Sequence, residues 1–191
     1  IGGEIVVFGC PSEEIVWGKV VMFERGAFHG IDAILTSHGD GRNGAASMPC
    51  KAVWSSEFVF MGEAGHGGRP PKNNALDAAE LAVQSMERLR AHHFPDTSVE
   101  HVLRVGGHMP SVTTDEARVW LVVRHEDFDR AGEVYRFAAK IFQRASDSAE
   151  TAMREQFIAS TRGYLPNHAL GRLLQRNLDI VGPPQWSAGD L

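Results

Sequence analysis

Apolar residues after about residue 53 recur with two different periods, and the two periods alternate along the chain. Apolar positions at every second residue are typical of a strand with one buried face, whereas steps of three and four are typical of an amphipathic helix. The strand-like segments begin near Val53 and then cover residues 98–105, 115–124 and about 151–161. One helix-like segment follows the first strand and a second follows the third. This order, strand-helix-strand-strand-helix-strand, predicts a ferredoxin-like unit over residues 53–163.

The two predicted helices have recognisable inner faces. Asn74 is a good N-cap, and Asp77 places a negative charge near the positive end of the first helix. The inner faces follow at three- and four-residue steps: Leu76, Ala79, Val83, Met86 and Leu89, then Phe128, Ala131, Val134, Ala138, Ile141 and Ala145. Two helices on one face of an antiparallel sheet leave the other face or an edge open, and a partner chain is one way to cover it.

The first fifty residues carry shorter apolar runs. Residues 4–10 and 31–35 are interpreted as buried parallel strands, with a short helix over Gly18–Arg25 between them. The glycine- and asparagine-rich stretch 36–44 is typical of a loop. These elements, together with a further helix predicted over residues 166–180, indicate the edge of an α/β layer.

Composition narrows the functional classes. The 191 residues are 43% hydrophobic and 23% charged, with a formal net charge of −5. A mildly acidic chain without a basic run is a poor nucleic-acid binder, and no apolar stretch is long enough to span a bilayer. Two cysteines do not make a disulfide framework, so a reducing, cytoplasmic compartment is expected. The chain starts at Ile1 and stops soon after a predicted helix, and we expect it to be part of a longer protein.

The stretch IVVFGCPSEE, residues 5–14, sets two glutamates side by side after a predicted buried strand. Adjacent residues point in different directions, so one carboxylate can bind a metal while the other acts as a general base. Ligand sites of α/β folds lie at such strand ends. Read alone, however, Glu13 and Glu14 are more often a solvated pair that opens a helix, where negative charge is favourable.

Other side chains have a functional and a plain structural interpretation. His38 ends the second apolar run and is a reasonable zinc or manganese ligand, or a surface histidine. His66 lies among glycines and is able to donate a hydrogen bond to an oxyanion, or is a turn residue. Arg124 ends a strand and is able to pair with a carboxylate, or is a surface charge. Cys10 is a candidate nucleophile with His38 as its base, or a small buried side chain.

Taken together, the motifs resemble one enzyme family. IVVFGCPSEE resembles a strand that ends in a Pro-Ala-Glu-Glu motif, and GAFHGIDAILTSH (26–38) resembles a strand that ends in a metal-binding histidine. GEAGHGGRPPKNNALDAAEL (62–81) and GGHMPSVTTDEARVWLVVR (106–124) resemble the opening and the central strands of an inserted dimerisation domain. The family is that of metal-dependent amidohydrolases and exopeptidases, with carboxypeptidase G and aminoacylase. The branch is that of the aminobenzoyl-glutamate hydrolases and the indole-acetyl-amino-acid hydrolases.

The resemblance implies a role for each candidate. Glu13 matches the general base, and Glu14 and His38 match two metal ligands. His66 matches a histidine that enters the partner subunit's active site and stabilises the tetrahedral oxyanion. Arg124 matches an arginine that holds the free carboxylate of the substrate. Ser111 stands where the family often carries an asparagine that contacts the substrate.

The resemblance also implies an organisation. It divides the chain into a partial α/β catalytic domain (1–52), an inserted α+β dimerisation domain with the ferredoxin-like βαββαβ order (53–163), and a return to the catalytic domain (164–191). One or two divalent ions, Zn or Mn, are expected in the intact protein. The upstream His/Cys and Asp ligands and the downstream His ligand are not in this chain, so its metal site is incomplete.

The implied activity is hydrolysis of the amide bond of a small N-acyl amino acid by a cytoplasmic homodimer, with this chain inactive alone. Three alternatives stay open. The first is a non-catalytic dimerisation module, the second is a binding remnant of the family, and the third is a cysteine hydrolase that uses Cys10.

Overall fold

The computed structural model describes residues 2–41, 43–45, 49–187 and 189. It divides the chain into two compact units. One unit consists of Ile1–Phe28 and Lys51–Gly163, and the other of His29–Cys50 and Tyr164–Leu191. The division of the chain at residues 52 and 163 that the resemblance implies stays a prediction.

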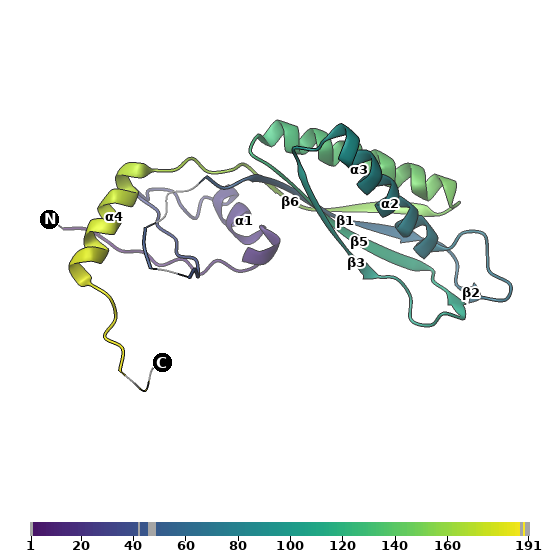
Figure 1. The fold of residues 1–191 in the computed structure, drawn as a ribbon, viewed down its shortest axis with the longest axis horizontal. Coiled ribbons are helices and arrows are strands. Elements are labelled where there is room, and N and C mark those ends of the chain that lie inside the picture. The colour runs from purple at the N-terminus through teal and green to yellow at the C-terminus, as the bar shows by residue number, and fades with distance from the viewer. Residues whose placement is uncertain (1, 42, 46–48, 188, 190–191) are drawn as a thin grey trace. The chain divides into compact units, whose positions relative to one another are not determined.

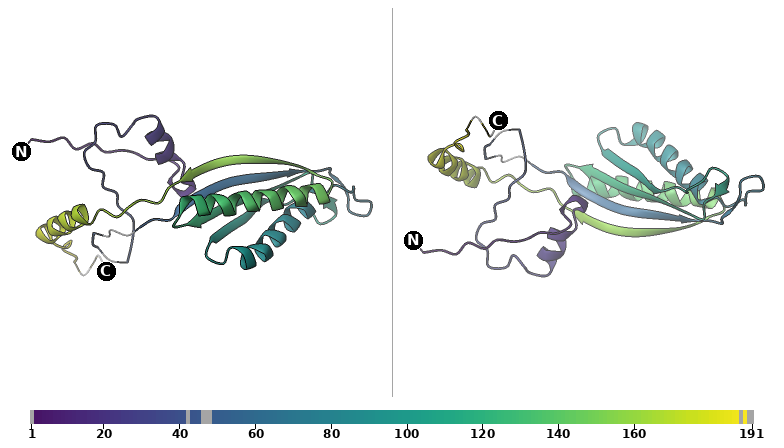
Figure 2. Two further views of the ribbon diagram at one scale, coloured as in Figure 1. Left: turned by 90° about the horizontal axis from the view of Figure 1, so that it is seen from above. Right: turned by 90° about the horizontal axis from the view of Figure 1, so that it is seen from below.

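The first unit is built on a four-stranded sheet with the strand order β3-β5-β1-β6. The strands are β1 (Ala52–Met61), β3 (Ser98–Val105), β5 (Glu116–His125) and β6 (Ala152–Thr161), and each neighbouring pair is antiparallel. The helices α2 (Ala75–His93) and α3 (Phe128–Ser148) lie together on one face of this sheet (Figures 1 and 2). The predicted ferredoxin-like arrangement is therefore confirmed.

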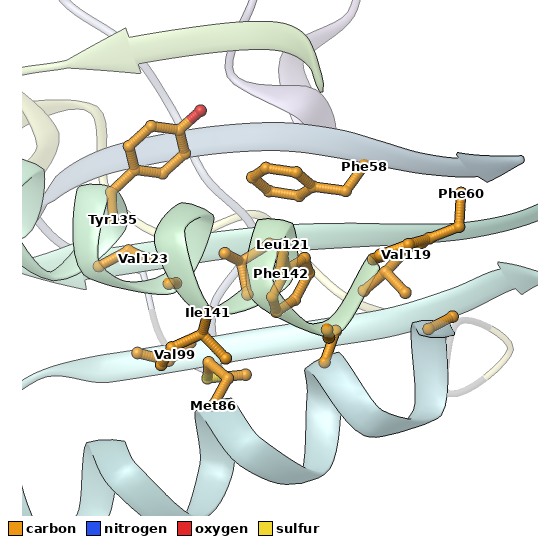
Figure 3. Close-up of a cluster of buried hydrophobic side chains, with 14 of the residues drawn as sticks. Phe58, Phe60, Met86, Val99, Val119, Leu121, Val123, Tyr135, Ile141 and Phe142 are labelled. Atoms are coloured by element: carbon orange, nitrogen blue, oxygen red, sulfur yellow. The ribbon is translucent and has the colours of Figure 1, made fainter. Parts of the chain in front are cut away.

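The alternation of β5 sets the two faces of the sheet. Its four predicted inward positions, Ala117, Val119, Leu121 and Val123, are all buried. Figure 3 shows how side chains from the strands meet side chains of α2 and α3 in one core. At its centre the rings of Phe58 and Phe142 lie 4.8 Å apart, edge to face. Aromatic pairs in this geometry add to the stability gained by burial.

The inner face of α3 agrees with its prediction, but that of α2 is shifted. Leu89, which was predicted to face the core, is 40% exposed. Leu81 on the same helix is 43% exposed. The buried stripe is made of small residues and one methionine: Ala75, Ala78, Ala79, Ala82 and Met86. Small side chains let α2 approach the sheet and α3 closely, and the larger leucines are turned toward its edge.

The second face of the sheet is covered by side chains of its own strands. Glu57 in β1 is buried and pairs with Arg104 Nη1 at 3.0 Å and Arg118 Nη1 at 3.2 Å. Trp120 Nε1 donates a hydrogen bond to Ser55 Oγ at 2.9 Å. A buried carboxylate is tolerated when it is paired and hydrogen-bonded. Long polar side chains thus shield this face from water.

Both ends of the ferredoxin-like unit meet in the sheet. Val53, near the start of β1, pairs with Thr161, the last residue of β6.

Asn74 caps α2 by accepting a hydrogen bond from the Leu76 amide at 3.1 Å, as predicted. Asp127 caps α3 in the same way, through the Arg130 amide at 2.8 Å.

The prediction of two parallel strands near the N-terminus is wrong. The segments 4–10 and 31–35 have no strand structure, and Ile5 and Val7 are about nine-tenths exposed. A strand needs a neighbour for its backbone hydrogen bonds, and no described segment pairs with either run. The segment instead forms a short 3₁₀ helix η1 (Glu13–Ile15) and the predicted helix α1 (Gly18–Glu24).

The second unit contains the helix α4 (His168–Val181), which confirms the helix predicted over residues 166–180. Asn167 caps it by accepting a hydrogen bond from the Leu170 amide at 3.0 Å. Within this unit, Gln175 Oε1 accepts a hydrogen bond from the Ala45 amide at 2.9 Å. Among the described residues, no helix has the length and apolarity needed to cross a bilayer.

Candidate functional site

His66 and Ser111 lie on one small ribbon beyond the end of the main sheet. The strands β2 (Gly65–His66) and β4 (Val112–Thr113) pair antiparallel, with His66 opposite Val112. The Gly67 amide donates a hydrogen bond to the Ser111 carbonyl at 2.7 Å. The structure therefore brings these two candidate residues together, although they are far apart in sequence.

An open cavity lies beside this ribbon, between the start of α2 and the segment that joins β3 to β5. Its volume is about 370 Å³. Its lining mixes apolar and polar side chains: Leu76, Met109, Pro110 and Val112 with Asn74, His108, Thr113 and Thr114. This size lies at the lower end of the range for small-molecule pockets.

Arg124 lies at the other end of the sheet. In the sheet it is paired with Val53 of β1 on one side and with Ser98 of β3 on the other. Its Nε lies 3.4 Å from Glu100 Oε2. Eight residue steps of β1 separate Val53 from Met61, beyond which the chain continues to His66. At about 3.4 Å per residue this is roughly 27 Å. One chain therefore does not bring Arg124 and His66 to the same place.

Glu13 and Glu14 are exposed on a tightly closed turn. The flanking residues Ser12 and Val16 have φ values of 56° and 60°, in the left-handed region. This conformation is strained for a β-branched residue such as valine. The turn is closed by the Val16 amide, which donates to the Glu13 carbonyl at 2.8 Å. Lys19 Nζ lies 4.0 Å from Glu13 Oε1.

A second open cavity, also of about 370 Å³, lies between this turn and the sheet. Ile15 and Trp17 line it from the turn side, and Glu57, Arg104, Gln156, Phe157 and Ile158 line it from the sheet. The turn that carries the two glutamates thus faces the side-chain layer around Glu57.

His38 belongs to the second unit, whereas Glu13 and Glu14 belong to the first. Its Nδ1 lies 2.7 Å from the Gly39 carbonyl oxygen. A carbonyl only accepts, so Nδ1 carries the proton and Nε2 keeps a free lone pair. The described residues form no cluster of three or more His, Cys, Asp or Glu side chains suited to a metal ion. Convergence of the two glutamates and His38 stays a prediction.

Cys10 is half-buried, and its thiol donates to the Phe8 carbonyl oxygen at 3.7 Å. Its supposed base, His38, lies in the other unit.

Sequence reasoning missed two polar groups of the first unit. One is the Glu57 cluster on the second face of the sheet. The other lies between α3 and the sheet, where the Tyr135 hydroxyl meets Ser56 Oγ of β1 at 2.5 Å and hydrogen-bonds the Glu155 carboxylate of β6. Burial, reinforced by the Glu155 carboxylate, raises the pKa of Tyr135. A charged residue at position 57 inside an apolar strand was the only available signal.

Comparison with known proteins gives the family. Residues 41–150, more than half of the chain, match the family model described as the peptidase dimerisation domain. The chain belongs to this family. The matched residues contain the elements from β1 to α3, and the fourth strand of the sheet, β6, follows directly after them.

Two curated relatives align with this chain and are longer than it. One of the subunits of p-aminobenzoyl-glutamate hydrolase from Escherichia coli is 30% identical over 193 aligned positions. The alignment covers the whole of this chain and 40% of the relative. The Xaa-Arg dipeptidase of Mus musculus is 33% identical over 111 residues, which are 57% of this chain and 26% of that protein. The chain therefore spans well under half of the relatives that it matches.

Solved structures agree on the fold of the dimerisation domain. The aminobenzoyl-glutamate utilization protein from Klebsiella pneumoniae matches with a TM-score of 0.54 and 21% identity. The match covers 71% of this chain and 35% of that structure. At this identity the likeness bears on the fold alone.

Proposed function

We propose that this chain supplies the dimerisation domain and part of the active site of a metal-dependent amidohydrolase. The reaction is hydrolysis of the amide bond of an N-acyl amino acid, with an aminobenzoyl-glutamate-like compound as the substrate class. The Escherichia coli relative, a p-aminobenzoyl-glutamate hydrolase that aligns with the whole of this chain, supports this substrate class. The 191 residues alone are expected to be inactive.

In the proposed reaction each candidate has one task. Glu13 accepts a proton from the attacking water and passes it to the leaving nitrogen. His66 donates a hydrogen bond to the oxygen that becomes negatively charged. Arg124 pairs with the free carboxylate of the substrate. Ser111, on the same ribbon as His66, contacts the substrate with its short hydroxyl side chain.

Glu14 and His38 are the proposed metal ligands from this chain. The chemistry of His38 fits this role, because its Nδ1–H is donated to a backbone carbonyl and its Nε2 lone pair is free. The remaining ligands must come from outside these residues. A bound Zn or Mn ion would activate water and polarise the amide carbonyl.

The proposal of an active site shared by two subunits rests on the separation of His66 from Arg124. Because roughly 27 Å of β1 lies between them, both residues reach one substrate only if one of them comes from a second copy. His66 lies on the ribbon that projects beyond the sheet, so it is the residue proposed to act in the partner subunit. The proposed assembly is therefore a homodimer.

The proposed contact between the two copies is the outer edge formed by β3 and α2. β3 is an edge strand whose outer backbone groups have no neighbouring strand in the described sheet. Val102 and Leu103 on this strand are 48% and 42% exposed, and Leu81 and Leu89 of α2 are similarly exposed. An unpaired edge bordered by apolar side chains favours pairing with a second copy.

The test is Glu13→Gln in the full-length protein. We expect it to keep its metal content and to lose most of its turnover, because only the proton acceptor is removed. Glu14→Gln is the matched comparison, and it is expected to lose metal as well as activity. Full turnover by the Glu13→Gln enzyme would refute the assignment.

A second candidate function is that of an assembly module without catalysis. The well-packed core of the first unit favours it, since that unit has its own buried residues and needs none from outside to form them. A stable dimer of the full-length protein with no hydrolysis of any N-acyl amino acid would support this function. Light scattering together with an amine-release assay separates the two.

A further inference from the structure

The imidazole of His66 is held by a backbone amide of its own turn. The Gly68 N–H donates a hydrogen bond to His66 Nδ1 at 3.0 Å. A ring nitrogen that accepts a hydrogen bond carries no proton, so the neutral ring has its proton on Nε2. His66 is exposed. Within the part of the chain that the structure describes, its Nε2 makes no hydrogen bond that competes for this proton.

The turn that makes this bond is fixed from both sides. The Arg69 amide donates to the His66 carbonyl at 2.8 Å, and the Gly67 amide donates to the Ser111 carbonyl at 2.7 Å. A Cβ on Gly67 would lie 3.1 Å from the Ser111 oxygen, and a Cβ on Gly68 would lie 3.2 Å from His66 Nδ1. Both positions therefore require a small residue, because Gly67 lies against the Ser111 backbone and Gly68 lies against the His66 ring.

The other candidate histidine has the opposite arrangement. His38 donates from Nδ1 to the Gly39 carbonyl, which leaves a lone pair on Nε2. His66 accepts at Nδ1, which leaves a proton on Nε2. Binding a metal through Nε2 requires the first arrangement, and donating to an oxyanion from Nε2 requires the second.

We propose that Gly68 is a positioning residue whose amide selects the Nε2–H tautomer of His66. The inference rests on the proposed function of His66 and deepens it. With the proton on Nδ1, the ring would turn a lone pair toward the oxyanion and repel it. With the Gly68 bond in place, the ring is ready to donate before the substrate arrives.

The direct test is nuclear magnetic resonance on the ¹⁵N-labelled chain of 191 residues at neutral pH. The His66→Gln variant identifies the His66 signals among those of nine histidines. We expect an Nε2-protonated ring and a scalar coupling across the hydrogen bond between Gly68 N and His66 Nδ1. A ring mainly protonated on Nδ1, or a ring without this coupling, overturns the proposal.

Two substitutions at one position add a matched comparison. Gly68→Pro removes the N–H and should leave a mixture of tautomers. Gly68→Ala keeps the N–H and should keep the Nε2–H form, with a small shift of the ring to accommodate the added carbon. The amide signals of Val112 and Thr113 report whether the ribbon is intact. An unchanged tautomer in a folded Gly68→Pro chain contradicts the proposal; if the ribbon unfolds, the coupling in the unsubstituted chain decides.

The same pair is then compared in the full-length enzyme. Gly68→Pro should lower kcat about tenfold with little change in KM, less than the hundredfold or greater loss expected when an oxyanion donor is removed. Gly68→Ala should stay near the unsubstituted rate. If His66→Gln keeps full turnover, the proposed role of His66 fails, whereas the tautomer measured by resonance still decides the role of Gly68.

Discussion

Arg124 and Val53 lie directly opposite each other where β1 begins, and His66 lies past the point where β1 ends. The four-stranded sheet runs between Arg124 and His66, with its core side chains buried on the helix side. No bending of a loop brings the two residues of one chain together. This relationship makes the proposed shared active site testable by mixing inactive subunits.

Mixed dimers of Glu13→Gln and His66→Gln subunits should recover activity. Each variant alone is expected to be inactive, but half of the randomly mixed dimers contain one site with both residues intact. Recovery of about a quarter of the unsubstituted activity is expected for a two-fold dimer. The measurement is turnover after subunit exchange, which a dye-labelled subunit confirms. Mixed dimers that stay inactive after proven exchange would show that His66 acts within its own subunit.

Tyr135→Phe should destabilise the first unit by about 1 kcal/mol, because the hydroxyl loses its hydrogen bonds to Ser56 and Glu155 while these two still bond each other. Tyr164→Phe is the matched control, since Tyr164 is 59% exposed. The pKa of Tyr135 is raised from 10.0 in the folded state, so its contribution is full below pH 10.0 and is lost as the pH rises further. Denaturant unfolding at neutral and at alkaline pH measures both effects. Equal loss in the two phenylalanine variants would contradict the buried network.

Gly18→Ala should open the turn that carries Glu13 and Glu14. An added Cβ would lie 1.7 Å from the Pro11 carbonyl oxygen, so Pro11 and residue 18 must move apart. Faster amide hydrogen exchange is expected in the peptide over residues 11–18, with a fall in turnover of the full-length enzyme. Gly9→Ala is the control, because a Cβ there meets nothing within 4 Å. Unchanged exchange in the Gly18→Ala protein would argue against the closed turn.

Glu116→Gln should reduce stability at neutral pH but not in strong acid. The hydrogen bond from Arg118, at 2.7 Å, is the main reason that the pKa of Glu116 lies below 4.5. A carboxylate with a lowered pKa stabilises the fold above its unfolded pKa, and this contribution disappears as the pH falls through the folded value. The stability curves of the two proteins should therefore converge below pH 4.5. Glu126→Gln, at an exposed position, is the control.

The ferredoxin-like unit was predictable because its own residues complete its hydrogen bonds and its core. The alternation from Ala117 to Val123 and the Asn74 cap are local signals, and the structure contains both. The inner face of α2 was predicted less well, because spacing alone does not say which side chains are small enough to pack. Leu89 has the right period, but the stripe of alanines is the one that is buried.

The prediction of the two N-terminal strands was wrong for a physical reason that no local sequence pattern reveals. A run such as IVVF has strand propensity, but a parallel strand exists only with a neighbour. The candidate residues showed a similar limit. Their types were visible in the sequence, whereas the Gly68–His66 bond and the separation of His66 from Arg124 depend on the folded turn and sheet.

The pairing of Val53 with Thr161 has a consequence for how such a unit is carried within a larger enzyme. The chain enters and leaves the sheet at adjacent points, so a host domain that carried this unit in one surface loop would keep its two flanking segments close together. On its second face the Glu57 cluster meets Ile15 and Trp17 of the N-terminal segment across an open cavity, so a neighbouring domain contacts the unit on this face. We therefore expect a longer protein to accommodate the unit without separating the two flanking segments.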